Sequence, residues 1–378
     1  MYSDVRICRD DIMDMLYLED CCEILDSMRV PITASDRIEG EYPYYGANGI
    51  QDYVADYIFD DELVLLAEDG GNFGSKEKPI AYRVSGKCWV NNHAHVLKPK
   101  EGLDIDYLCY SLMFYKVDGM VNGATRQKLT QTAMRKMQIP SRTMEEQIGI
   151  VGELKRVVCI KEQRQQELQL LDDLIKARFV ELFGDININD KNWDCEPLGE
   201  LCTIVRGGSP RPIEQFLGGD VPWIKIGDAT DGDNIYLTST QEHIIQEGVK
   251  KSRLVKSGSL IFANCGVSLG FARIITFDGC IHDGWLAMED IDDRLDKVFL
   301  LQALNQMTEH FRKIAPAGTQ PNLNTAIMKA YKQVIPPIEL QREFIRFAEQ
   351  VDKTKVAVQK ALDKTQLLFD SLMQEYFG

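Results

Sequence analysis

The sequence predicts an α+β fold in which two mixed α/β domains alternate with two long helices, and in which the second half of the chain repeats the first. Sliding the sequence on itself by 194 residues places 125–184 over 319–378 with 13 identities in 60 positions, where ordinary composition gives about three or four. Both copies end in Phe-Gly. Each copy contains a long heptad pattern, preceded by short apolar runs with glycine turns.

The domain boundaries follow from this repeat. We expect an α/β domain and then a helix in each half, over 1–140, 141–184, 185–335 and 336–378. Weaker similarities extend the repeat toward the start of each half. "LEDCCEI" at 18–24 resembles "LGELCTI" at 198–204, and "LVLLAEDGGNFG" at 63–74 resembles "LIFANCGVSLG" at 260–270. Both pairs predict short buried strands followed by turns.

The composition is that of a globular chain rather than a membrane protein. The 378 residues are 44% hydrophobic and 27% charged, which suggests two or three domains with sizeable cores. No apolar run reaches the roughly 18 residues of a membrane span, and the opening "MYSDVRICRDD" has neither the basic nor the apolar region of a secretion signal. We therefore expect a cytoplasmic chain, with its ten cysteines reduced rather than in disulfides or a zinc site.

The net charge of −15 is unevenly distributed. Residues 1–70 hold 18 acidic and 4 basic side chains, whereas residues 71–140 hold 11 basic and 5 acidic ones. "KKSRLVK" at 250–256 adds a second basic cluster. Basic surfaces of this kind suit a partner that carries phosphates, and an acidic remainder limits nonspecific association. The alternative interpretation is that these segments are solvated loops.

The first long helix begins with a capping box formed by Thr143 and Glu146 in "TMEEQIGIVGELKRVV". A heptad reading makes seven of its ten seam positions apolar, so the helix requires a packed partner. The expected residues for helix pairing and subunit contact in this helix are Val151, Leu154, Val158, Lys161, Gln165, Leu168 and Ile175.

The second helix repeats the pattern, and its predicted seam also places Asp352 at a core position. If the two helices pair antiparallel, the polar layers at Gln165 and Gln359 would meet near the middle and help to fix the register. Such a pair relates the two domains by an approximate two-fold axis, as suits readers of DNA half-sites about 34 to 36 Å apart. Alternatively, the polar residues face solvent on a loosely packed helix. The expected contacts in this helix are Ile345, Lys355, Gln359, Leu362 and Phe369.

Catalytic motifs are missing from the sequence. It contains no GxxxxGK[ST] phosphate loop, no strand-associated GxGxxG, no HExxH, and no Asn-Pro-Pro-aromatic or Asp-Pro-Pro-aromatic motif. His93 and His95 fall on one face of a strand without a third ligand nearby in the sequence, so we expect no metal site. Cys265 and Ser268 in "CGVSLG" have no identifiable histidine and acid to activate them, which favours a buried turn.

Several loops carry side chains suited to DNA. "YPYYGANGIQDY" at 42–53 combines aromatic residues with amides that can bond adenine, and "RGGSPRP" at 206–212 offers arginines that can bond guanine. "GATRQKLT" at 123–130 and "AGTQPNLN" at 317–324 precede the two helices and suit phosphate or groove contacts. Alternatively, each loop is ordinary turn chemistry. The candidate DNA-binding residues are Tyr44, Tyr45, Asn48, Gln51, Lys76, Lys78, Arg83, Asn91, Asn92, His93, Arg126, Lys128, Arg206, Arg211, Lys250, Lys251, Arg253, Gln320 and Asn322.

Together, these segments resemble the specificity subunit of type I restriction-modification systems. The similarity covers almost the whole chain, and the order, spacing and duplication of its motifs carry it more than any single motif does. The acidic opening departs from the family pattern, because it is longer than the segment before Leu198. Besides the two segments before the helices, the motifs are "IPSRTMEEQ" at 139–147, "IPPIELQ" at 335–341, "YYGANGIQDYV" at 44–54 and "WVNNHAHVLKP" at 89–99.

The resemblance implies that each α/β domain is a target recognition domain, that the helices pair as an antiparallel coiled coil, and that the domains read the two halves of a bipartite double-stranded DNA target. Two methyltransferase subunits using S-adenosylmethionine would bind the helices. A restriction and translocase subunit using ATP and Mg would join them, and this chain would bind no cofactor itself. The methyltransferase subunits would supply much of the phosphate contact, which makes the acidic N-terminal stretch tolerable.

Two other functions remain compatible with the sequence. One is a noncatalytic scaffold whose helices recruit proteins and whose domains bind proteins or peptides. The other is the recognition part of a nuclease whose catalytic motif escapes recognition. Exchange of one domain tests the first, since it changes half of a DNA target only in a two-domain reader, and a metal-dependent nicking assay tests the second.

Overall fold

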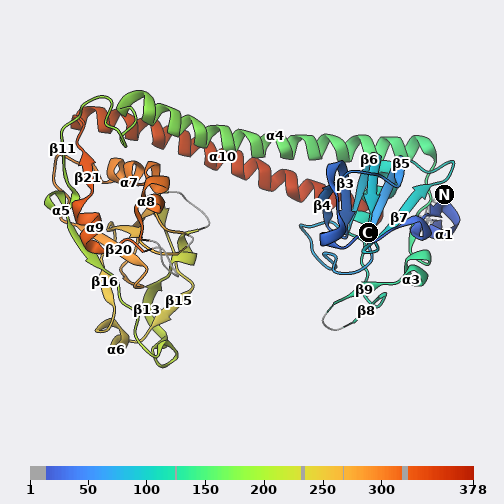
Figure 1. Cartoon of the computed structure of the whole chain (residues 1–378), viewed down its shortest axis with the longest axis horizontal. Coiled ribbons are helices and arrows are strands. Elements are labelled where there is room, and N and C mark those ends of the chain that lie inside the picture. The colour runs from blue at the N-terminus through green and yellow to red at the C-terminus, as the bar shows by residue number, and fades with distance from the viewer. Residues whose placement is uncertain (1–13, 124–125, 231–234, 267, 317–321) are drawn as a thin grey trace, which may run out of the picture. The chain divides into compact units, whose positions relative to one another are not determined.

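The computed structural model describes residues 14–123, 126–230, 235–266, 268–316 and 322–378 (Figure 1). The chain forms two compact units, of which the first is Met1–Gln165 with Lys360–Gly378 and the second is Gln166–Gln359. Each unit combines an α/β domain with parts of two long helices, α4 (Met144–Phe183) and α10 (Ile338–Phe377). The expected mixed architecture with two long helices is confirmed.

The first unit is built on a six-stranded sheet with the order β2-β7-β5-β6-β3-β4. Its strand pairs are antiparallel except β3 with β6, which is parallel. Strand β1 pairs with β10, and β8 with β9. The elements are β1 (Met15–Tyr17), α1 (Leu18–Cys21), β2 (Cys22–Ile24), β3 (Glu39–Gly46), β4 (Gly49–Val54), β5 (Phe59–Ala67), β6 (Ala81–Val90), β7 (Ala94–Pro99), α2 (Ile105–Met113), β8 (Val121–Asn122), β9 (Lys128–Leu129), α3 (Gln131–Arg135) and β10 (Gln138–Pro140).

Strand β5 lies inside this sheet because the second half of its sequence is apolar on both faces. Val64 and Leu66 belong to the core that includes α2 and the start of α4. Leu63 and Leu65 alternate with them and pack into a separate apolar cluster on the other face. All four side chains are fully buried, so the strand firmly positions the residues that follow it.

The second unit contains two sheets, with the orders β12-β20-β17-β18-β14 and β15-β13-β19-β16. Strand β11 pairs with β21 outside these sheets, as β1 pairs with β10 in the first unit. The elements are β11 (Cys195–Pro197), α5 (Leu198–Leu201), β12 (Thr203–Arg206), β13 (Leu217–Ile224), β14 (Tyr236–Leu237), β15 (Glu242–Ile244), α6 (Gln246–Val249), β16 (Arg253–Val255), β17 (Leu260–Ala263), β18 (Ala272–Ile275), β19 (Gly279–Ile281), β20 (Trp285–Glu289), α7 (Lys297–Gln306), α8 (Thr308–Ile314), α9 (Thr325–Ala330) and β21 (Lys332–Val334).

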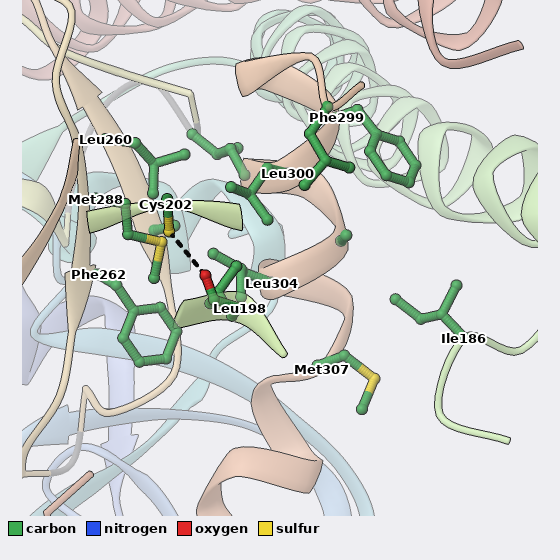
Figure 2. Packing of buried hydrophobic residues seen from close by; sticks show 14 of the residues in the cluster. Ile186, Leu198, Cys202, Leu260, Phe262, Met288, Phe299, Leu300, Leu304 and Met307 are labelled. Atoms are coloured by element: carbon green, nitrogen blue, oxygen red, sulfur yellow. Dashed lines mark hydrogen bonds between the residues drawn. The ribbon is translucent and has the colours of Figure 1, made fainter. Parts of the chain in front are cut away.

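The main core of the second unit lies between the five-stranded sheet and α7. Figure 2 shows Leu260 and Phe262 of β17 facing Leu304 of α7. Cys202 lies in the same core, and its Sγ donates a hydrogen bond to the carbonyl of Leu198 across 3.4 Å. This packing fixes the ends of β17 and β20, from which the loops of the candidate site extend.

A buried glutamine joins the start of α4 to the first domain. The side-chain oxygen of Gln147 accepts a hydrogen bond from the backbone N–H of Asp104, which caps α2, at 2.8 Å. Its amide nitrogen donates to the carbonyls of Gly102 at 3.0 Å and Arg142 at 2.9 Å. The side chain therefore satisfies three backbone groups at once.

The matching glutamine of the second copy makes the same set of bonds. Gln341 accepts from the backbone N–H of Asp296, the cap of α7, at 2.8 Å. It donates to the carbonyls of Arg294 at 2.9 Å and Pro336 at 2.6 Å. Because Gln147 and Gln341 are 194 residues apart, the internal repeat predicted from the sequence is confirmed at the level of individual hydrogen bonds.

The predicted capping box at the start of α4 is present. Glu146 Oε2 accepts a hydrogen bond from the backbone N–H of Thr143 at 2.8 Å, and Thr143 Oγ1 accepts one from the N–H of Glu146 at 3.3 Å. The reciprocal bonds satisfy two donors that a helix start otherwise leaves unpaired. No helix in the described part of the chain combines the length and apolarity that crossing a membrane requires.

The two long helices pair antiparallel within each unit. In the first unit Tyr376 donates a hydrogen bond to Glu153 at 2.6 Å, while the ammonium of Lys161 lies 4.9 Å from the ring centre of Phe369. In the second unit two ion pairs join the helices, Lys355 to Asp172 at 2.6 Å and Arg178 to Glu343 at 2.7 Å. In both units the partner's number falls as the α4 number rises, so the predicted antiparallel pairing is confirmed.

One column of the α10 seam lies one residue earlier than predicted, whereas the column that contains Lys355, Leu362 and Phe369 lies where the heptad placed it. The heptad reading places Asp352 and Gln359 at core positions, whereas the structure buries Val351 and Val358 and exposes Gln359. The predicted contact residues Val151, Leu154, Ile175 and Phe369 are buried, Val158, Lys161, Leu168, Ile345, Lys355 and Leu362 are half-buried, and Gln165 and Gln359 are exposed. Lys161 contacts the ring of Phe369 and Lys355 pairs with Asp172, so these two lysines lie against the opposite helix rather than against each other.

A candidate nucleic-acid interface in each unit

Four segments of the first unit converge beside the end of β5. The N–H of Glu68 bonds the carbonyl of His93 at 2.9 Å, and the N–H of Leu129 bonds the carbonyl of Glu68 at 2.7 Å. Asn48, in the turn between β3 and β4, donates from Nδ2 to the carbonyl of Gly70 at 3.0 Å. We call the surface formed by residues 47–49, 68–70, 92–93 and 126–130 the first surface.

Three matching segments converge in the second unit. The N–H of Asn264 bonds the carbonyl of Gly284 at 2.9 Å, and the N–H of Leu323 bonds the carbonyl of Asn264 at 2.8 Å. Cys265 forms an isolated β-bridge with Asn322, as Asp69 does with Lys128 in the first unit. We call the surface formed by residues 206–212, 264–266, 282–284 and 322–324 the second surface. The same backbone frame therefore carries different side chains in the two units.

A carboxylate organises the cations of the first surface. Asp69 Oδ1 lies 2.7 Å from Nη2 of Arg126 and 2.7 Å from Nδ1 of His93. Lys128 forms an ion pair with Glu68 at 2.9 Å. The Arg126 side chain is 60% exposed and that of Asp69 only 16%, so the acid lies beneath and the guanidinium on top.

A buried polar network supports this surface from below. His95 Nδ1 lies 2.7 Å from Asp26 Oδ2, and its Nε2 lies 2.8 Å from the carbonyl of Leu129. Burial alone raises the pKa of Asp26, but the hydrogen bond and the charge of His95 outweigh it and lower that pKa below its ordinary value. Burial likewise raises the pKa of Glu68, and its bonds to Arg29 and Lys128 bring it below the ordinary value. Both acids are therefore ionised at neutral pH.

The same network contains a cluster with the spacing of metal ligands. Asp26, Glu68 and His95 offer atoms that lie within 4.8 Å of one another, whereas the sequence offered no third ligand near His95. However, Arg29 already bonds Glu68 at 2.6 Å and lies 3.4 Å from Asp26. Both ring nitrogens of His95 are already engaged, by Asp26 and by the carbonyl of Leu129, so neither is turned toward an open position for a metal ion. The cluster is an ion-pair network that supports Leu129.

A second carboxylate organises the second surface. Asp283 accepts a hydrogen bond from Ser209 at 2.7 Å and lies 3.8 Å from Nη2 of Arg211, while its carbonyl accepts from Nε of Arg206 at 3.0 Å. His282 Nε2 lies 2.9 Å from its Oδ1. Burial raises the pKa of Asp283, but Ser209 and the nearby positive charges outweigh burial and lower it. Burial lowers the pKa of His282.

The basic segment 250–256 adjoins the second surface. Ser252 donates a hydrogen bond to the carbonyl of Gly208 at 2.7 Å, which ties this segment to the arginine loop. Lys250 and Arg253 are exposed. The ammonium of Lys251 lies 4.5 Å from the ring centre of Phe216. The two basic motifs of the second half are therefore neighbours in the fold.

The structure places Cys265 beside His282 and Asp283, a pair that the sequence did not identify. A Cβ built on Gly284 would lie 3.1 Å from Sγ of Cys265 and 3.0 Å from Nδ1 of His282. However, Nδ1 accepts a hydrogen bond from the N–H of Gly284 at 2.9 Å, and Nε2 faces Asp283. Burial raises the pKa of the Cys265 thiol, and the charge of Asp283 raises it further. No imidazole nitrogen is thus available to activate this cysteine as a nucleophile.

Some predicted DNA-binding residues lie elsewhere. Tyr44 is buried, and its hydroxyl bonds the backbone of Ile32. Asn91 is buried and donates to Gln51 at 3.0 Å, so neither Tyr44 nor Asn91 reaches the surface. Arg83 pairs with Glu62 and with Asp106 of α2. Tyr45 is half-buried, Lys76 and Lys78 are exposed outside the two surfaces, and Gln320 lies outside the described residues. Asn92, by contrast, is exposed on the first surface.

The acids of both surfaces were not predicted from the sequence. Asp69 and Asp283 carry negative charge, whereas basic and amide side chains are the ones that suit direct contact with DNA. A signal was present nonetheless, since Asp69 follows a buried strand in "AEDGG" and Asp283 follows His282 at a turn. Polar residues at strand ends deserve equal weight whatever the sign of their charge.

Comparison with known families gives a match over most of the chain. Residues 13–170 and 190–365 match the family described as the type I restriction modification DNA specificity domain. A Haemophilus influenzae protein named as a candidate specificity subunit of a type I restriction enzyme is 29% identical over 358 residues, which cover 91% of this chain and 89% of that protein. The MjaIX type I specificity subunit of Methanocaldococcus jannaschii is 22% identical over 176 residues, which cover 45% of this chain and 40% of that subunit.

Solved structures share the fold. The S subunit of a type I restriction-modification system from M. genitalium matches with a TM-score of 0.54 at 15% identity, over 98% of both chains. A chain from a structure concerned with assembly and conformational transition of the type I restriction-modification system matches with a TM-score of 0.61 at 16% identity, over 96% of both chains. At these identities the likeness concerns the fold alone.

Proposed function

The chain belongs to the type I restriction-modification DNA specificity family, with one domain in each half, and from this we propose that it reads a bipartite DNA target on behalf of methyltransferase and restriction subunits. The observation that carries the proposal is the pair of surfaces with one backbone frame and different side chains. Membership of a specificity family also agrees with the expectation of a noncatalytic chain.

Each surface offers a different set of groups to DNA. The first combines the exposed guanidinium of Arg126 with Asn48 and His93, whereas the second combines Arg206 and Arg211. Arginine can bond guanine in two places, and asparagine can bond adenine in the same way. Different side chains on equivalent frames suit two unlike half-sites.

The outer faces of the long helices suit protein partners. In the first unit Ile148 of α4 and Leu367 of α10 are 58% and 68% exposed, and in the second unit Leu170 of α4 is 60% exposed. A protein partner that covers these side chains would remove their apolar surface from water. We propose that two methyltransferase subunits, which use S-adenosylmethionine, bind there. A translocase and nuclease subunit, which uses ATP and Mg, would join them.

The acidic balance of the chain fits a shared interface. A net charge of −15 disfavours tight binding of DNA by this chain alone. We propose that the methyltransferase subunits provide much of the phosphate contact. Tight, nonspecific DNA binding by the isolated chain at about 0.15 M salt would contradict this division.

Exchange of one domain tests the proposal. Residues 1–140 are replaced by the matching domain of a relative with a different target, and the methylated DNA sequence is read out in cells that contain the partner subunits. We expect one half of the target to change and the other half to stay. An unchanged target would favour the protein-binding scaffold instead.

A further inference from the structure

Each surface holds a carboxylate close to where DNA would lie, although a negative charge there repels phosphates. Asp69 on the first surface and Asp283 on the second each contact an imidazole and lie beside an arginine. The two acids come from different strand ends, Asp69 after β5 and Asp283 before β20. The same grouping has therefore been built from different segments of the repeat, which indicates a shared role.

The geometry at Asp69 restricts how Arg126 is presented. Within the described part of the chain, this guanidinium makes its polar contacts through Nη2, to Asp69 at 2.7 Å and to His93 Nδ1 at 3.3 Å. The remaining N–H groups are left for another acceptor. His93 Nδ1 faces the same carboxylate at 2.7 Å, and within the described residues its Nε2 is left for another partner.

The geometry at Asp283 is comparable. Ser209 bonds one carboxylate oxygen at 2.7 Å and so fixes the loop between Arg206 and Arg211. Arg211 lies 3.8 Å from the other oxygen and is 80% exposed, while Arg206 bonds the carbonyl of Asp283 through Nε. The carboxylate of Asp283 thus fixes the loop through Ser209 and lies near Arg211, while the backbone of the same residue holds Arg206.

We propose that Asp69 and Asp283 are positioning residues, which orient Arg126 and the Arg206–Arg211 pair toward a guanine in each half-site. The proposal rests on the function proposed above. A guanidinium held at one end can present its other N–H groups in the fixed, planar arrangement that bidentate bonding to guanine requires. Each acid therefore lowers the affinity for DNA of any sequence and raises the preference for the target sequence.

This role predicts opposite effects on two affinities. Asp69→Asn removes a negative charge from the interface, so binding to nonspecific DNA is unchanged or tighter. The same substitution releases Arg126, so the preference for the target falls by about tenfold to a hundredfold, the range that one bidentate pair provides. The loss is confined to the half-site read by the first domain, and Asp283→Asn acts on the other half-site.

The experiment uses the complex of this chain with its methyltransferase subunits. The target is taken from the methylation map of the wild type, and competition titrations measure the dissociation constants for target, for each half-site mutant and for unrelated DNA. Asp61→Asn is the matched control in the first unit, since Asp61 is paired with Lys98 on the sheet. Glu196→Gln, which loses its pairing with Arg294, is the control in the second. We expect both controls to retain the wild-type ratio between the dissociation constants for unrelated DNA and for the target.

Two further variants separate positioning from folding. Arg126→Lys keeps Asp69 and the positive charge but loses bidentate bonding, so it reproduces the lost preference at the same half-site. In Arg126→Ala, adding Asp69→Asn causes no further loss of preference.

Equal gains in both affinities would show that Asp69 only repels DNA, and equal losses with a lower melting temperature would show a purely structural role. Either result overturns the inference while leaving the proposed function intact. A wild-type complex without sequence preference overturns both.

Discussion

Gln147 and Gln341 show what duplication means for single residues. Each side chain is buried, bonds the N-cap residue of a domain helix and satisfies two further carbonyls. Few side chains can serve one N–H donor and two carbonyl acceptors together, but an amide can do so. The identity of these two glutamines in the sequence alignment therefore has a physical cause.

Replacing either glutamine with leucine should destabilise its unit. Gln147→Leu keeps the volume but leaves three partly buried backbone groups without this partner, so we expect a loss of about 2 to 4 kcal/mol in the free energy of unfolding. Gln341→Leu should cost a similar amount. Urea titrations measure the effect, with the exposed Gln163→Ala on α4 as the control. A loss below about 0.5 kcal/mol, the scale of ordinary surface changes, would contradict the role of these hydrogen bonds in stability.

The network at Asp26 predicts how stability depends on pH. The folded-state pKa of Asp26 is lowered, so its contribution is present above the unfolded value of about 3.9 and disappears as the pH falls through the folded value. Asp26→Asn should lower the free energy of unfolding by about 3 kcal/mol at pH 7 and flatten its decline below about pH 4. Unfolding titrations from pH 7 to pH 3 check this. An unchanged acid slope in the variant would assign the decline to other groups.

Residue roles were predictable only in part from the sequence. Tyr44 and Tyr45 are adjacent on β3, and neighbouring strand residues point to opposite faces, so one tyrosine was bound to lie inside. The sequence does not reveal which, because the flanking Pro43 and Gly46 show no alternation of apolar and polar side chains. Asp69 was overlooked because its role depends on Arg126, 57 positions away.

The long helices were predicted well in extent and direction but not in register. In α4 both Val157 and Val158 are apolar, so a heptad fits either one. In α10 the matching positions are Val351 and Asp352, and the structure buries Val351. The sequence of α4 therefore leaves open which of two adjacent positions faces the seam, and the burial of Val351 in α10 shows that it is the first of them.

Two substitutions in α10 test this register. Val358 is buried in the seam, so Val358→Ala should lower the free energy of unfolding by about 1 to 3 kcal/mol through lost apolar contact and a cavity. Gln359 is exposed, so Gln359→Ala should change it by no more than about 0.5 kcal/mol. Thermal or urea unfolding measures both. The reverse order of effects would restore the heptad predicted from the sequence.

At the scale of the whole molecule, duplication is the property that the sequence revealed most clearly. The repeat predicted two α/β domains and two helices, and the structure contains both. The target bases could not be predicted, because they depend on how Arg126, Arg206 and their neighbours are oriented at the interface. Those orientations arise from contacts between segments far apart in the chain, which sequence patterns do not report.

The central claim is that one chain with two reading surfaces directs methylation to one bipartite sequence. The most direct test is a genome-wide map of N6-methyladenine in cells with and without this gene, with the methyltransferase subunits present in both. We expect methylation to disappear from a single bipartite motif when the gene is removed. An unchanged map, with the methyltransferase shown to be active, would contradict the claim and favour a protein-binding scaffold.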